Sequence, residues 1–178
     1  MTCIVGVEKR GTVWLGGDSA GTASNMHQRV RADKKVFIKG DFIMGFCGSF
    51  RMGQLLQCSL VIPERQSAGD DYSWLVTDFT AAVKKCLSEG GGEGEEKLQP
   101  YFLFGYKGKL YGMHGDYQVS KPEFGFDAMG SGADIAIGAM HASKGKWNPK
   151  KRILQALEAS AHNNAAVRPP FHVLSLKK

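Results

Sequence analysis

The chain has 178 residues, of which 43% are hydrophobic and 22% charged, and we expect them to form one globular domain spanning residues 1–178. The formal net charge is +6, but the basic residues are scattered, which argues against nucleic acid as a partner. The four cysteines lack the spacing of metal ligands, and no apolar run approaches the ~20 residues of a transmembrane helix. We therefore expect a cytoplasmic protein with reduced thiols that uses no metal, cofactor or membrane.

The first third of the chain is rich in strand patterns. Residues 3–9 and 12–18 are apolar and β-branched around an Arg-Gly turn, which predicts a hairpin. Residues 19–33 have no strong periodicity and predict a loop or an irregular arm. A second hairpin is predicted over residues 34–49, with its turn at Gly40 and Asp41.

Helical periodicity follows over residues 49–60, before Pro63, and over residues 72–88. The short connection between these two helices predicts that they lie next to each other. The Gly- and Glu-rich residues 88–96 predict an exposed, flexible loop.

The last part of the chain repeats this order. A third hairpin is predicted over residues 101–115, and residues 125–143 predict a strand, a Gly-Ser-Gly turn and a helix. Residues 148–164 predict a helix with Asn148 as its N-cap, and residues 171–176 a last strand. Strands followed by helices, twice, predict an α+β fold with two antiparallel sheets between two helical layers. The aromatic residues expected in the core, at layer interfaces or, for some, at contacts between subunits are Trp14, Phe37, Phe42, Phe46, Trp74, Phe79, Phe102 and Phe104.

Thr2 directly follows the initiator methionine, and this position suggests a chemical role. If Met1 is removed, one residue carries both a hydroxyl and a free α-amine. An α-amine has a pKa of about 7.7–8.0, so its neutral form can act as the base for the hydroxyl beside it.

Four further residues could complete such a site. Asp18 follows the second strand, Lys35 begins the third, Gly45 ends the fourth, and Ser131 lies in the Gly-Ser-Gly turn. A lysine near the hydroxyl would lower its pKa, a carboxylate would orient the lysine, and a backbone N–H would stabilise an oxyanion. Each residue alone also fits a structural role. Asp18 could lie in a turn and Lys35 at a solvated strand edge. Gly45 could allow close packing, and Ser131 could cap the following helix.

The order of these residues resembles a known family. The stretches TCIVGV, VWLGGDSAGT, KKVF, IMGFCGS and MGSGADIAIGA are similar to the proteasome β-subunit family, and especially to the HslV-like peptidases among the N-terminal-nucleophile (Ntn) hydrolases. The resemblance covers nearly the whole chain, with its most specific parts before Gly48 and in the 130–132 turn.

The resemblance implies a four-layer αββα sandwich and threonine-type hydrolysis of peptide bonds in a ring of identical subunits. It implies that Thr2 is the nucleophile, Asp18 and Lys35 the charged pair beside it, Gly45 the oxyanion glycine, and Ser131 the partner of the amine; Lys34 ranks after Lys35. HslV-like peptidases work with a separate AAA+ unfoldase, and this chain has no phosphate-binding GxxxxGK[ST] loop of its own.

The chain also departs from the family pattern. An aspartate that the family pairs with the serine is missing, and His162, Asn163 or Asn164 stands in that stretch. If Thr2 were removed as well as Met1, Cys3 would become the N-terminal nucleophile. Two other functions stay open: a catalytically impaired, ring-forming structural subunit, and an Ntn hydrolase that acts on small amides.

Overall fold

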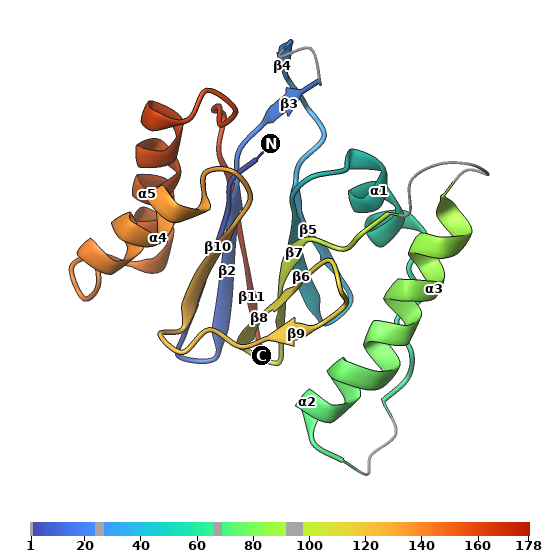
Figure 1. Cartoon of the computed structure of the whole chain (residues 1–178). Coiled ribbons are helices and arrows are strands. Elements are labelled where there is room, and N and C mark those ends of the chain that lie inside the picture. The colour runs from blue at the N-terminus through green and yellow to red at the C-terminus, as the bar shows by residue number, and fades with distance from the viewer. Residues whose placement is uncertain (1, 24–26, 66–68, 92–97) are drawn as a thin grey trace.

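The computed structural model describes residues 2–23, 27–65, 69–91 and 98–178. The expectations for Met1 and for most of the Gly- and Glu-rich segment therefore fall outside the described residues. The elements form four layers, with two facing sheets enclosed by helices on both outer sides (Figure 1). This is the αββα arrangement expected from the sequence, and the α+β fold class is confirmed.

The first sheet has the order β10-β1-β2-β11, and its neighbouring strands are antiparallel. Its strands are β1 (Ile4–Lys9), β2 (Thr12–Gly17), β10 (Phe126–Met129) and β11 (His172–Lys177). Two helices cover its outer face, α4 (Ala133–Ala142) and α5 (Pro149–Asn163). As predicted, Asn148 caps α5, because its side chain accepts a hydrogen bond from the backbone N–H of Lys151.

The second sheet has the order β5-β6-β7-β8-β9 and is also antiparallel. Its strands are β5 (Val36–Lys39), β6 (Phe42–Phe46), β7 (Phe102–Tyr106), β8 (Lys109–Met113) and β9 (Val119–Ser120). Its outer face is covered by α1 (Phe50–Cys58) and by a long helix made of α2 (Asp71–Trp74), the π-helical stretch η1 (Leu75–Phe79) and α3 (Thr80–Gly90). The predicted adjacency of the two helices is confirmed, because Arg51 donates to the Gly90 carbonyl.

Three apolar cores lie between the four layers. Successive side chains at the start of β1 point alternately into two of these cores. Cys3 and Val5 belong to the core under α4 and α5, whereas Ile4 belongs to the core between the two sheets. The third core lies between the second sheet and its helices and holds most of the predicted core aromatics. Because β1 is central in its sheet and buried on both faces, its N-terminal end is held firmly.

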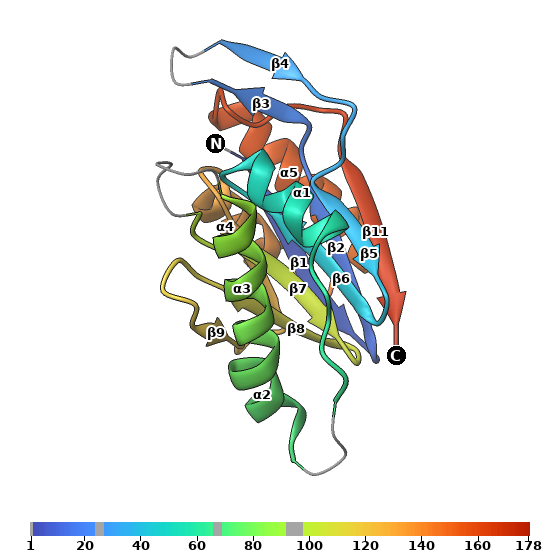
Figure 2. The same ribbon diagram turned by 90° about the vertical axis from the view of Figure 1, so that its right-hand side faces the viewer.

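One expectation was wrong in detail. Residues 19–33 are not simply a loop, since they contain a two-stranded ribbon of β3 (Ala20–Thr22) and β4 (Gln28–Val30) (Figure 2). The strands are too short for a sequence pattern to stand out. Trp14, which the sequence predicts in the core or at a layer interface, is half-buried and packs against the core beneath α4 and α5.

Candidate functional site

The hydroxyl of Thr2 lies against a buried lysine. Lys35 Nζ donates to Thr2 Oγ1 at 2.9 Å and forms an ion pair with Asp18 Oδ1 at 2.8 Å. All three residues are at most 2% exposed. Burial lowers the pKa of Lys35, and the negative charge of Asp18 opposes that change. The arrangement therefore holds a cationic donor on the Thr2 hydroxyl, away from water.

Backbone groups from three segments fix the Asp18 carboxylate. Its Oδ1 accepts from the N–H of Cys3 at 3.0 Å, and its Oδ2 accepts from the N–H of Ala20 at 2.9 Å and of Arg168 at 3.3 Å. Asp18 immediately follows β2, so its side chain turns back toward the start of β1. These donors stabilise the buried charge and orient Lys35 toward Thr2.

The glycine-rich turn after β10 encloses the other side of Thr2. Ser131 Oγ accepts from the Thr2 backbone nitrogen at 3.3 Å and lies 3.4 Å from the Thr2 carbonyl oxygen, to which it can donate. The N–H of Gly132 donates to the same carbonyl at 3.2 Å. Gly130 has φ +105°, and a Cβ at this position would collide with the Thr2 carbonyl, so the turn requires glycine there.

Known structures share this arrangement of layers. The chain matches a structure described as Thiobacillus denitrificans BPH in complex with epoxomicin with a TM-score of 0.80 and 17% identity, covering 99% of this chain and 98% of that one. It matches HslV from Trypanosoma brucei with a TM-score of 0.71 and 20% identity, covering 99% and 100% of the two chains. Anbu, the ancestral beta-subunit, from Yersinia bercovieri matches with a TM-score of 0.70 and 15% identity, covering 99% and 82%.

The chain has the proteasome-type fold of the Ntn hydrolases. No family model matches the sequence, and a search of curated proteins finds no match either. At identities of 15–20%, the likeness to these structures concerns the fold. What the site around Thr2 does must be argued from the residues of this chain.

Among the three residues that the sequence analysis offered for the missing aspartate, Asn164 contacts Ser131. Its Nδ2 donates to the Ser131 carbonyl at 2.8 Å, while its Oδ1 accepts from the N–H of Ala166 at 2.9 Å. The other two candidates, His162 and Asn163, are exposed, and Asn163 hydrogen-bonds within α5. The sequence left three candidates because all lie at the end of α5, where one residue changes the direction of a side chain by about 100°.

Gly45 lies within β6, paired with Val36 of β5 and Leu103 of β7. A Cβ at Gly45 would lie 2.8 Å from Cγ2 of Ile4 and 3.1 Å from Cγ1 of Val36, so the glycine allows the two sheets to approach. The structure thus brings Thr2, Asp18, Lys35 and Ser131 into hydrogen-bond contact, and it gives Gly45 a packing role beside them. Lys34, the second-ranked lysine, is exposed.

The thiol of Cys3 points to the opposite side of β1 from the Thr2 hydroxyl. It is fully buried, donates to Ser160 Oγ of α5 at 3.6 Å, and has a pKa that burial raises to about 12. Cys47 also borders the site, and burial raises its pKa to about 11 despite the nearby Lys35 charge. Both thiols are therefore protonated at neutral pH, and these observations favour Thr2 over Cys3 as the nucleophile.

The sequence analysis did not identify a pocket that lies near Lys35. The β3–β4 ribbon extends beyond the sandwich at the end where the N-terminus lies (Figure 2). Its Arg29 and Arg31, with Phe50 of α1, line a pocket there. Arg29 lies in β4 and Arg31 directly follows it, so recognising an extended backbone over residues 28–31 would have placed both arginines on one face.

Two searches of the described residues gave negative results. Within residues 2–23, 27–65, 69–91 and 98–178, no cluster of three His, Cys, Asp or Glu side chains is arranged to hold a metal ion. Among the helices of these same segments, none has the length and apolar character needed to cross a bilayer.

Proposed function

We propose that this protein is a threonine-type peptidase that cleaves polypeptides with Thr2 as its N-terminal nucleophile. The observation that carries the proposal is the contact of Lys35 Nζ with both Thr2 Oγ1, at 2.9 Å, and Asp18, at 2.8 Å. A buried ammonium aimed at a hydroxyl oxygen stabilises the alkoxide that forms when the hydroxyl loses its proton. The proposal treats residues 1–178 as one domain, because residues as distant in sequence as Thr2 and Asn164 meet in this site.

The chemistry needs Thr2 to be the first residue. While Met1 is attached, the Thr2 nitrogen is a peptide nitrogen and has no basic lone pair. After Met1 is released, the α-amine accepts the proton of Oγ1, and Oγ1 attacks the carbonyl carbon of the scissile peptide bond. The leaving amine takes that proton, an ester to Thr2 remains, and a water molecule hydrolyses the ester to regenerate the hydroxyl.

Ser131 and Asn164 support this step in the proposal by holding the Thr2 nitrogen in place. Ser131 Oγ lies 3.3 Å from that nitrogen, and Asn164 fixes the Ser131 backbone from the other side. The oxyanion of the tetrahedral intermediate is assigned to the backbone N–H of Gly45, the residue that the family resemblance indicates. Gly45 also pairs with Val36 and Leu103 and packs against Ile4, and the variant Gly45→Ala separates this packing from a role in oxyanion binding.

The proposal includes a ring of identical subunits, served by a separate AAA+ unfoldase. Exposed large apolar side chains, among them Val61, Phe124 and Trp147, offer surface for contacts between copies. Size-exclusion chromatography with light scattering on the purified protein would test the ring. A monomer at micromolar concentration would argue against it.

The test of the peptidase activity starts with the intact mass, to identify chains that begin at Thr2. Such chains should hydrolyse fluorogenic peptides and be labelled on Thr2 by a threonine-directed covalent inhibitor. Thr2→Ala should reduce hydrolysis by at least about 10³-fold while leaving the melting temperature unchanged. Full activity in Thr2→Ala would overturn the proposal. Cleavage of small acyl-amides but not of peptides would replace it with the small-amide alternative.

A further inference from the structure

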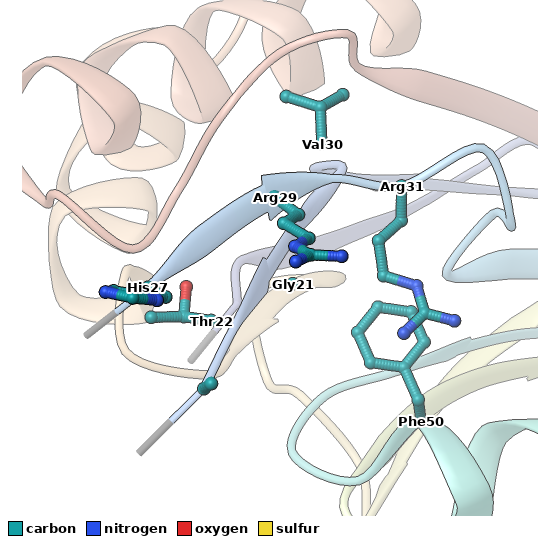
Figure 3. Close-up of a pocket in the computed structure, with 8 residues that line it drawn as sticks. Gly21, Thr22, His27, Arg29, Val30, Arg31 and Phe50 are labelled. Atoms are coloured by element: carbon teal, nitrogen blue, oxygen red, sulfur yellow. The ribbon is translucent and has the colours of Figure 1, made fainter. Parts of the chain in front are cut away.

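A pocket of about 630 Å³ opens beside the nucleophile, between the β3–β4 ribbon and the start of α1 (Figure 3). Its lining residues are Gly21, Thr22, Ala23, His27, Arg29, Val30, Arg31 and Phe50. The ribbon contributes all but Phe50, the first residue of α1. The pocket plays no part in the chemistry at Thr2 described above, so its lining must be explained by what it binds.

The Phe50 ring connects this pocket to the nucleophile. The Arg31 guanidinium carbon lies 4.0 Å from the centre of the ring, and Lys35 Nζ lies 5.7 Å from the same centre. Lys35 in turn contacts Thr2 Oγ1. One aromatic ring thus lies between the pocket and the lysine that contacts the Thr2 hydroxyl. Since successive residues of an extended peptide are about 3.3 Å apart, an occupant of the pocket lies within a few residues of the cleaved bond.

The pocket carries excess positive charge. Arg29 and Arg31 line it, and none of its described lining residues is acidic. Arg31 is neutralised by Asp33 through two hydrogen bonds of 2.7 Å, from Nε and from Nη2. Within the described part of the chain, Arg29 forms no ion pair, so the unbalanced charge comes from Arg29.

The backbone of the ribbon keeps both arginines on the pocket side. Arg29 and Arg31 are two residues apart and point the same way, whereas Val30 points away (Figure 3). Gly21 is the partner of Arg29 across the ribbon, and a Cβ there would lie 2.6 Å from Cδ of Arg31. The missing side chain leaves room for the stem of Arg31, whose guanidinium then stacks on Phe50.

We infer that this pocket binds an acidic side chain, Asp or Glu, of the polypeptide substrate close to the scissile bond. The inference rests on the proposed function for its link to cleavage. Arg29 supplies the charge that a carboxylate needs, since an arginine and a carboxylate form strong, charge-assisted hydrogen bonds. Arg31 lines the pocket, but its charge is already balanced by Asp33. A basic side chain is disfavoured there by repulsion from Arg29.

The test separates binding from cleavage. Eight-residue peptides that carry one glutamate at successive positions, each matched with a glutamine version and labelled with fluorescein, are titrated into Thr2→Ala protein at low salt. At the position that reaches the pocket, the glutamate peptide should bind about tenfold more tightly than its glutamine match. Arg29→Gln should abolish this preference, whereas Lys150→Gln, which removes an exposed charge on α5, should keep it.

Each outcome has a distinct meaning. Equal binding of glutamate and glutamine peptides at every position would overturn the inference, as would a preference that survives in Arg29→Gln. The same peptides are then given to the parent protein with Thr2 as its verified first residue. Arg29-dependent binding without any cleavage would refute the proposed peptidase function and leave the anionic side-chain site standing. Cleavage without glutamate preference would leave the peptidase function and remove the inference.

Discussion

Lys35 and Asp18 form an ion pair of 2.8 Å in which the side chains are 1% and 0% exposed. Each charge is tolerated inside the protein because the other lies beside it, together with the backbone donors to the carboxylate. The pair therefore stabilises the fold and also holds the Lys35 ammonium against the Thr2 hydroxyl. Its two roles can be separated by measuring stability and hydrolysis on the same variants.

Lys35→Met should abolish hydrolysis and destabilise the fold by about 3 kcal/mol, because it leaves the Asp18 charge buried without its partner. Urea unfolding gives the stability and a fluorogenic peptide the activity. Lys34→Met, at the exposed neighbouring position, should change the stability by less than about 0.5 kcal/mol. If Lys35→Met unfolded at the same urea concentration as the parent protein, the buried pair would not contribute as described.

Asn164→Asp should lower activity, although it introduces the residue type that the family carries. The Asn164 amide donates to the Ser131 carbonyl, and a carboxylate at the same place can only accept, so two oxygens would repel each other. We expect kcat to fall about tenfold, with the Ser131 turn displaced from the Thr2 nitrogen. His162→Asp, at an exposed position nearby, serves as the control. Higher activity in Asn164→Asp would contradict the donor role.

The cysteines should differ sharply in reactivity. Cys58 is exposed, whereas Cys3, Cys47 and Cys86 are buried. Burial raises the pKa of Cys3 to about 12 and that of Cys47 to about 11, so neither forms an appreciable amount of thiolate at pH 8. Iodoacetamide should therefore alkylate Cys58 first in the native protein, and all four cysteines in denaturant, as peptide mass mapping would show. Rapid alkylation of Cys3 in the native protein would support the alternative in which Cys3 is the nucleophile.

The variant Gly45→Ala tests whether Gly45 takes part in catalysis or only in packing. The new methyl group would lie 2.8 Å from Cγ2 of Ile4, which should destabilise the protein by about 1–3 kcal/mol. Ile4→Ala in the same chain removes that contact, so the double variant should be more stable than the sum of the single effects predicts. If Gly45 also donates to the oxyanion, activity should stay low in the double variant; recovery of both properties would limit Gly45 to packing.

Asp127 should make stability depend on pH. It lies on β10, and burial raises the pKa of its carboxyl above the ordinary value. The folded protein therefore holds this proton more tightly than the unfolded chain does, and stability falls as the pH rises from the unfolded pKa through the raised one. Asp127→Asn should raise the melting temperature at pH 7 and lose this advantage near pH 3. An exposed carboxyl, Asp116, offers the control Asp116→Asn.

The sequence predicted the layers well because each long element carries its own period. The apolar, β-branched strands, the cap at Asn148 and the glycine turn at 130–132 are local signals, and the structure confirms the elements that they indicate. The contact of Lys35 with Thr2 could be expected from the family resemblance but not from local pattern, since it joins two strands of different sheets.

Other parts depend on tertiary contacts that no local pattern contains. The short ribbon of β3 and β4 is held by its position beside the start of α1, where Arg31 stacks on Phe50. Asn164 could not be selected from three neighbours without the direction of each side chain at the end of α5.

The alternation at the start of β1 has a consequence for maturation. Thr2 faces Lys35 between the sheets, and Cys3 faces Ser160 under the helices, so odd and even positions of this segment enter different layers. Trimming one residue too many would place a new first side chain in the wrong layer, with its amine moved away from Ser131. For the proposed peptidase, only a chain that begins at Thr2 therefore has its first side chain beside Lys35. Removal of one further residue would yield a folded but inactive protein.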